Sequence, residues 1–280
     1  MHTLMMTTGL ALAWGVRWFW TGSTGTLSQR WQQTLGLFLF SPLLLLMTAI
    51  AVLCMGPTGR MLGHWEGWFS YDLAFGFSMW AIVAGVKLAW DGQQTVRRIQ
   101  QNPLITVNGN SARLLATAIP YTAQVGFWQP ELVVSQGLLD TLDDEHLMAV
   151  LTHERAHAQR HDTFWFFWLG WLRRVTVWLP YTEALWQELL MLRELRADRD
   201  AAQHVDPLVL AESLLLVVSQ LQLQPEVCAA FGWAASHDRL TERIDSLLNE
   251  APVPGSIQPW SLSWLLCVLL PLATIPLHGG

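Results

Sequence analysis

The stretch LGLFLFSPLLLLMTAIAVLCM, from Leu35 to Met55, decides the class of this chain. It lies at the centre of an uncharged run, residues 31–59, that is bounded by Arg30 and Arg60. About 20 consecutive apolar residues are enough for a helix to cross the hydrocarbon core of a bilayer. The stretch therefore predicts a transmembrane helix at about residues 33–56.

The composition of the whole chain favours the same class. Hydrophobic residues make up 52% of the 280 residues and charged residues only 14%, whereas a soluble domain is about a quarter charged. The net charge of -6 leaves no basic surplus for phosphate groups, so no direct nucleic-acid binding is expected. The chain has seventeen tryptophans and three tyrosines. Tryptophan is enriched at membrane–water interfaces, so this composition favours a protein in contact with the lipid bilayer.

Three further apolar runs predict spans at about residues 4–20, 68–90 and 256–280. Arg17 lies at the end of the first run, where its side chain is expected to extend to the interface. The run at 68–90 is the weakest, because Asp72 and Lys87 lie near its ends, and an interfacial or buried helix is the alternative there. The chain is thus expected to have three transmembrane helices within residues 1–90 and a fourth in residues 256–280.

The basic residues near the predicted spans indicate an orientation. Five of them fall on one side of a four-span arrangement and Arg60 alone falls on the other; the five are Arg17, Arg30, Lys87, Arg97 and Arg98. Because the side richer in arginine and lysine is usually cytoplasmic, residues 91–255 are predicted to form a cytoplasmic domain. The expected protein is a multi-pass protein of the inner or cell membrane with both termini outside.

The segment 91–255 has mixed patterns, which predict a cytoplasmic α+β domain inserted between spans three and four of a mainly α membrane protein. Turn signals flank short β-prone pieces at Leu104–Val107 and Leu132–Ser135, which predict a small antiparallel sheet. Helix signals dominate from Asp143, a good N-cap residue. Helices are expected at about residues 143–161, 182–204, 208–222 and 238–249.

The chemistry is concentrated in the first of these helices, in Val150-Leu-Thr-His-Glu-Arg-Ala-His157. His153 and His157 are four residues apart, so both imidazoles leave the same face of a helix and can reach one metal ion. Glu154 is then placed beside the metal, where it can take a proton from the attacking water. This is the HExxH pattern of zinc peptidases, and a chance match in such a chain has odds of roughly 1%.

A third protein ligand is needed, because catalytic zinc usually takes three side chains and keeps one open position. Glu194 lies on a predicted helix, and Asp198 one turn later can accept the free N–H of a ligating histidine. The alternative is that both carboxylates only decorate an arginine-rich helix face, and it is disfavoured once the HExxH pattern is present.

Several stretches together resemble one family. They are Asn102-Pro-Leu, Trp128-Gln-Pro-Glu-Leu-Val-Val, Gly137-Leu-Leu, His153-Glu-Arg-Ala-His-Ala-Gln-Arg-His-Asp162 and Glu194-Leu-Arg-Ala-Asp198. They are similar to those of the BlaR/MecR-type membrane metallopeptidases, the antirepressor proteins of β-lactam sensing. The order of three spans, a cytoplasmic zinc domain and a fourth span is similar too. This chain ends at Gly280, where those sensor-transducers continue into an extracellular penicillin-binding domain, so a short form without that sensor is expected.

The resemblance implies a zincin-like (gluzincin) domain and an enzyme with one zinc ion per chain. His153, His157 and Glu194 would bind the zinc, Glu154 would be the general base and acid, and Asp198 would orient a ligand. The implied function is signal transduction by cleavage of a protein or peptide substrate, a transcriptional repressor in the described members, which also cleave themselves. A membrane zinc peptidase of the HtpX or CAAX-protease type, acting in quality control, is the alternative within the enzyme class.

Substrate binding suggests further residues. A peptide would add as a strand to a sheet edge, and the piece Phe127–Ser135 is the expected edge, with Trp128, Leu132 and Val134 as contacts. His237 and Arg243 are candidates for oxyanion or substrate contacts, although a turn or helix-surface role is the more common one for such residues. Two residues of the next turn are discounted: His161 as a solvated helix end, and Asp162 as a helix terminator or cap.

Two questions stay open at this point. A non-catalytic membrane signalling or binding protein with a structural metal site is the competing class, although no residue of the motif is degenerate. Small residues in the spans are compatible with a homo-oligomer but do not argue for one. The sequence identifies neither the substrate nor the activating signal.

Overall fold

The computed structural model describes residues 2–57 apart from 19, 21 and 23, together with residues 64–222, 233–249 and 259–276. Its contacts divide the chain into two compact units. The helical unit comprises residues 1–89, 168–190 and 254–280, and the sheet unit comprises residues 90–167 and 191–253. The predicted domain boundaries at residues 90 and 255 came from the ends of the expected membrane spans, not from contacts, and stay predictions. Arg60, used for the orientation, lies outside the described residues.

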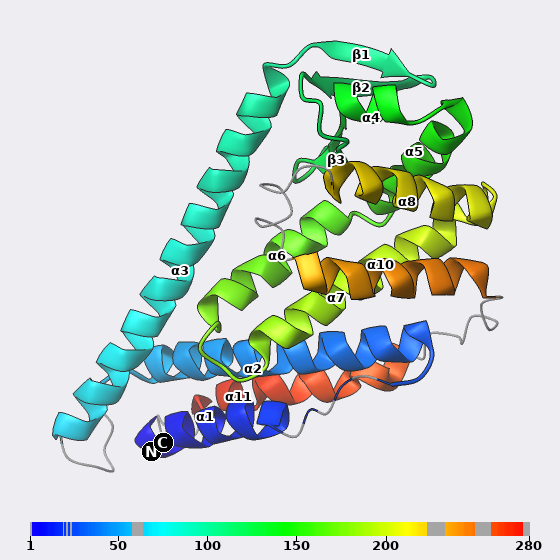
Figure 1. The fold of residues 1–280 in the computed structure, drawn as a ribbon. Helices are drawn as coiled ribbons and strands as arrows, with labels where there is room; N and C mark the ends of the chain where they lie inside the picture. The colour runs from blue at the N-terminus through cyan, green and yellow to red at the C-terminus, as the bar shows by residue number, and fades with distance from the viewer. Residues whose placement is uncertain are drawn as a thin grey trace. The chain divides into compact units, whose positions relative to one another are not determined.

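The helical unit is built around one long apolar helix. Its elements are α1 (His2–Trp18), α2 (Leu27–Met55), the first part of α3 (His64–Gln100), η1 (Pro259–Leu269) and α11 (Leu270–Ala273), with parts of α6 (Asp162–Val175) and α7 (Thr182–Ala201). Helices α1 and α11 both pack on α2 (Figure 1). Thr26 begins α2 with a capping box, in which its hydroxyl accepts from the Gln29 amide.

Among the described residues, two helices are long and apolar enough to cross a membrane: α2 and residues Trp68–Gln100 of α3. The apolar window of α2 is 56% buried in the unit, but that of α3 is only 17% buried. Such an exposed apolar helix suits a lipid environment, which supports membrane association. The expected spans at 4–20 and 256–280 coincide with shorter helical segments among the described residues and stay predictions.

Arg17 was expected to extend to the membrane interface, but its side chain is fully buried in the helical unit. Its guanidinium donates to the Phe38 carbonyl at 3.1 Å and to the Thr182 hydroxyl. A buried guanidinium needs such acceptors, since burial of an unpaired charge is costly. Arg17 therefore joins α1 to α2 and to the start of α7.

The sheet unit contains a four-stranded sheet in the order β1-β2-β4-β3. The strands are β1 (Leu104–Val107), β2 (Asn110–Leu115), β3 (Thr122–Val125) and β4 (Glu131–Ser135). Strands β1 and β3 pair antiparallel with their neighbours, but β2 and β4 are parallel, with Ala112 opposite Leu132. The prediction of an antiparallel sheet is therefore wrong at this pair. The physical reason is that β3 returns the chain before β4 begins, so that β4 runs in the direction of β2.

Strand β4 is an interior strand, because it pairs with β2 on one side and with β3 on the other. The prediction that Leu132 and Val134 offer a sheet edge is therefore wrong. Their side chains are buried, and Trp128 lies before the strand with 77% of its side chain exposed. The free edges of the described sheet are β1 and β3.

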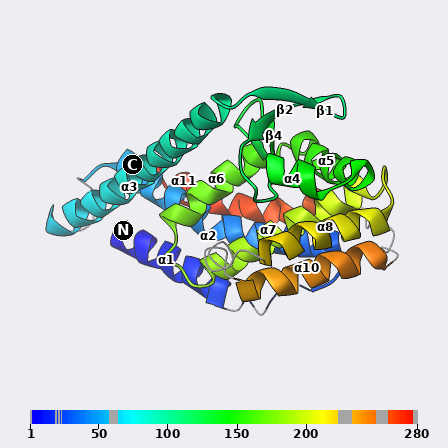
Figure 2. The same cartoon turned by 45° about the horizontal axis from the view of Figure 1, so that its top comes forward.

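Apart from the last part of α3, the helices of the sheet unit come after β4 in the chain. They are α4 (Gln136–Thr141), α5 (Asp144–Gln159), the first part of α6, the last part of α7, α8 (Pro207–Gln222) and α10 (Trp233–Leu248). Asp143 caps α5 as predicted, by accepting from the His146 amide at 3.0 Å. Leu147, Val150 and Leu151 of α5 pack with the buried side chains of β2 and β4. This packing fixes α5 beside the sheet (Figure 2).

Candidate metal centre

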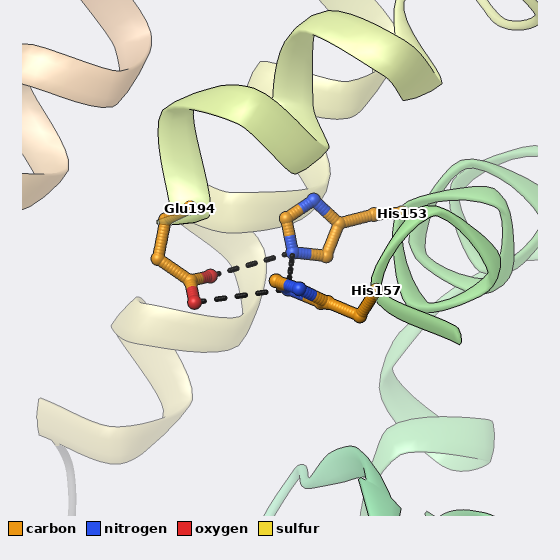
Figure 3. Close-up of side chains that lie close together, drawn as sticks. All are labelled: His153, His157 and Glu194. Carbon is orange, nitrogen blue, oxygen red and sulfur yellow. Dashed lines mark hydrogen bonds and ion pairs between the residues drawn. The ribbon is translucent and has the colours of Figure 1, made fainter. Parts of the chain in front are cut away.

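Two histidines of α5 and one glutamate of α7 converge in the sheet unit (Figure 3). The His153 and His157 Nε2 atoms are 3.1 Å apart. Glu194 places one carboxylate oxygen 3.4 Å from the His153 Nε2 and the other 3.7 Å from the His157 Nε2. One donor atom from each residue lies within 4.8 Å of the other two. Two imidazoles and a carboxylate at such distances can hold one metal ion, and they are a donor set that zinc accepts.

The backbone of α5 explains why the two histidines meet. They are four residues apart on a continuous helix, so their side chains stack on one face. Their rings are nearly perpendicular, with an interplanar angle of 86°. Both side chains are buried, and so is Glu154 between them. The two histidines and Glu154 are thus shielded from water, and the histidines meet Glu194 of α7, whereas Arg155 of the same stretch is exposed.

The outer nitrogen of each histidine meets a carboxylate. The His153 Nδ1 lies 2.8 Å from an Asp198 oxygen, and the His157 Nδ1 lies 2.6 Å from an Asp162 oxygen. Asp198 is 1% exposed and Asp162 6%. A carboxylate on the outer nitrogen fixes the tautomer, so that Nε2 keeps its lone pair for a metal. The His157–Asp162 contact has hydrogen-bond geometry, whereas the His153–Asp198 contact is an ion pair without it, so His157 is the more firmly oriented ring.

Asp162 is the functional candidate that the sequence reasoning missed. It was interpreted as a helix terminator or cap, and it does begin α6. The chain reverses at the exposed His161, whose φ of 53° lies in the left-handed region. That reversal brings Asp162 back onto His157. The signal that could have revealed it is its position five residues after a ligand histidine, directly behind the helix end.

Two arginines hold the carboxylates of α7. Arg243 of α10 donates to both oxygens of Asp198, at 2.7 and 2.8 Å, and lies 3.5 Å from Glu194. Arg193 donates twice to one oxygen of Glu194 and packs its guanidinium over the Phe166 ring. The two-oxygen contact of Arg243 fixes the plane of the Asp198 carboxylate, whereas Arg193 holds one oxygen of Glu194. Arg243, predicted as an oxyanion or substrate contact, is thus engaged with Asp198 and Glu194.

The electrostatics of the site separate its two glutamates. Burial raises the pKa of Glu154, and the charge of nearby His153 opposes this rise only in part. Burial would also raise the pKa of Glu194, but its contacts with both imidazoles and the charge of Arg243 hold it well below its ordinary value. Glu194 is therefore a carboxylate ready to bind a cation, whereas Glu154 is placed to exchange a proton.

Other predicted residues lie elsewhere or cannot be placed. His237 belongs to α10, but its side chain lies outside the described part of the structure. Tyr121, which the sequence reasoning did not select, begins the chain leading into β3, and β3 packs against α5. Burial raises the pKa of its hydroxyl, and the nearby charge of Glu154 raises it further. Tyr121 therefore lies within the electrostatic range of Glu154.

Comparison with known proteins gives one family. The model of Peptidase family M48 matches residues 121–189, about a quarter of the chain. The matched segment contains β3, β4 and the whole of α5 with its HExxH stretch, and it ends before Glu194. No curated protein and no solved structure matches the chain. The match supports a metallopeptidase of family M48, and it does not distinguish the BlaR/MecR type from other members.

Proposed function

We propose that the chain is an integral-membrane zinc metalloendopeptidase that hydrolyses peptide bonds of a protein substrate. The observation that carries the proposal is the convergence of His153, His157 and Glu194 around one point, with the buried Glu154 beside it. The match to a peptidase family over the segment that contains three of these four residues supports it independently.

Each residue has a role in this proposal. His153, His157 and Glu194 would hold one zinc ion, and Asp198 and Asp162 would keep the two imidazoles oriented. Bound zinc would supply Lewis-acid stabilisation of the charge that develops on the scissile carbonyl oxygen. Glu154 takes a proton from the attacking water and passes it to the leaving amine, a task that suits a carboxylate whose pKa is raised by burial.

The substrate would add as a strand to β3 rather than to β4. Strand β3 is a free edge of the described sheet, it packs against α5, and the residue before it, Tyr121, interacts with Glu154. An extended peptide that pairs with β3 would therefore pass close to the proton-transferring carboxylate. A protein segment that can become extended is the substrate class that this edge accepts, and a transcriptional repressor or a segment of the enzyme itself would both qualify.

The membrane arrangement is the second part of the proposal. Four spans, with the sheet unit cytoplasmic and both termini outside, agree with the apolar character of α2 and α3 and with the arginine distribution. Single cysteines placed at Ser111 and at Thr3 test this in intact cells with a membrane-impermeant maleimide, after Cys54, Cys228 and Cys267 are changed to serine. We expect labelling at Thr3 alone, and labelling at Ser111 would overturn the orientation.

The experiment for the activity removes and restores the metal. The detergent-purified chain is expected to contain about one zinc per chain and to cleave a quenched casein or peptide substrate. A strong chelator should abolish cleavage, and stoichiometric zinc should restore it. Zinc that binds without any cleavage under these conditions would favour a binding protein with a structural metal site.

A further inference from the structure

The sheet unit has a cavity of about 460 Å³ apart from the candidate metal centre. It lies between α5 and the end of the sheet at which β2 and β4 begin, and its lining includes Ser111, Gln124, Glu131, Leu132, Leu151 and Arg155. The three candidate ligands and Glu154 are not among its lining residues. Its volume is within the range of about 300–1,000 Å³ that ligand pockets occupy.

The geometry of α5 explains why the cavity is separate. Arg155 follows His153 by two residues, which is about 200° around a helix, so the two side chains leave opposite faces. One face of α5 thus presents the histidines to α7, and the other presents Leu151 and Arg155 to the cavity. Helix α5 therefore contributes residues to the candidate metal centre from one face and to the cavity from the opposite face.

The chemistry of the cavity combines an apolar floor with an unbalanced positive charge. Leu132 and Leu151 are buried, at 9% and 4% exposure, and line the floor. Glu131 accepts from Arg113 at 2.7 Å and from the Gln100 amide at 2.8 Å, so its charge is already matched. Arg155 is exposed and donates a single hydrogen bond, at 3.2 Å, to the neutral amide oxygen of Asn110.

Such a cavity suits an acidic group on an apolar stem. Methylene groups can lie on the two leucines, while a carboxylate meets the Arg155 guanidinium. A carboxylate adds an opposite charge and can accept two parallel hydrogen bonds from a guanidinium, whereas the neutral Asn110 oxygen accepts one. Arg155 therefore forms a stronger interaction when a substrate carboxylate replaces the Asn110 oxygen, and the ion pair between Arg113 and Glu131 need not be broken.

The free edge of β3 connects the cavity with the metal centre. Gln124, near the end of β3, lines the cavity, and β3 packs against α5, the helix that carries Glu154. Tyr121, before the start of β3, lies within the electrostatic range of Glu154. Three residues of strand span about 10 Å. A peptide pairing antiparallel with β3 would run from the cavity toward Glu154, so the residues before its scissile bond would lie along β3. Directly opposite residues of an antiparallel pair share a face. The substrate residue opposite Gln124 would thus point to the side of the sheet that Gln124 and Leu132 share.

We propose that this cavity is a specificity subsite, which binds an acidic side chain of the substrate, above all glutamate, a few residues before the scissile bond. The inference rests on the proposed peptidase function and names a substrate class for it. Arg155 is its specificity-determining residue. Leu132 and Leu151 provide the apolar contact that favours glutamate over a shorter acid.

The test compares peptides that differ at one position. Glutamate, glutamine or lysine is placed in turn at each of the five positions before the cleaved bond, and kcat/KM is measured for each with the full-length chain in detergent. We expect one upstream position at which glutamate exceeds lysine by about tenfold. Arg155→Glu should invert that preference. Ser111→Trp, which fills the cavity from an exposed position of β2, should abolish the preference, so that the glutamate and lysine peptides are cleaved with similar kcat/KM.

Arg98→Glu is the matched control, because Arg98 is exposed and is absent from the cavity lining; it should keep the wild-type preference. Binding of the same fluorescent peptides to Glu154→Gln gives a readout apart from turnover, and the dissociation constants should follow the same order. Cleavage that depends on Glu154 but ignores the acidic residue would overturn the subsite and leave the peptidase assignment intact. Absence of any Glu154-dependent cleavage would overturn the peptidase, and the subsite with it.

Discussion

Glu154→Gln should lower kcat for peptide cleavage by about a thousandfold, within the range that general acid–base catalysis contributes. Glutamine has nearly the size of glutamate, so the buried position between the two histidines stays filled, but an amide cannot accept a proton from water. Glu154 is not among the three clustered donor residues. The variant should therefore keep the wild-type content of about one zinc per chain, which elemental analysis of the purified protein measures alongside cleavage of a quenched peptide.

Glu145→Gln is the control for this change, since it makes the same substitution in the first turn of the same helix at an exposed position. It should keep both metal and activity. If Glu154→Gln cleaved at more than about a tenth of the wild-type rate, proton transfer by this residue would be excluded as a major contribution. If it lost its metal instead, Glu154 would have to be counted among the ligands.

Local parts of the site could be predicted from the sequence because they depend on one helix. The interval between His153 and His157 sets their common face, and Asp143 with its capping role sets where α5 begins. Both follow from residues a few positions apart. The helices at 182 and 208 were expected within a few residues of their observed starts for the same reason.

The convergence of Glu194 on the histidines depends on how α7 packs against α5, which is a long-range property. The spacing of Glu194 and Asp198 made them candidates, but only the fold brings Glu194 within 3.7 Å of both Nε2 atoms. Asp162 was missed for a related reason. Its contact with His157 requires the left-handed turn at His161, a conformation that a histidine seldom adopts and that no local pattern indicates.

The prediction of a sheet edge at Phe127–Ser135 was the largest error, and it too depends on long-range packing. The short β-prone piece Leu132–Ser135 indicates a strand, and Pro130 before it suggested an edge. A proline just before a strand does not interrupt its ladder, however, and β4 is paired on both sides. Which strands lie at the edge depends on partners distant in sequence, so β3, with only four residues, was not recognised as the free edge beside α5.

His153→Ala and Glu194→Ala should each reduce bound zinc from about one per chain to nearly none after dialysis. Three protein side chains are the usual number for catalytic zinc, and loss of one leaves two donors for an ion that also binds water. Metal content by elemental analysis, with far-UV circular dichroism to confirm that the helices persist, gives the result. Cleavage should be lost in both variants.

Asp162→Asn separates orientation of a ligand from ligation itself. Its carboxylate contacts the Nδ1 of His157 and none of the three clustered Nε2 and carboxylate donors, so the variant should still bind one zinc, with an affinity about 10- to 100-fold lower in competition with a chelator. Asp198→Asn should weaken binding as well, but Asp198 also pairs with the guanidinium of Arg243. This change leaves that largely buried charge with only the longer contact to Glu194, so it should lower stability too. Asp162→Asn is therefore the cleaner measure. Unchanged zinc affinity in that variant would show that the short contact with His157 does not prepare the imidazole for a metal, whereas complete loss of zinc would place Asp162 among the ligands.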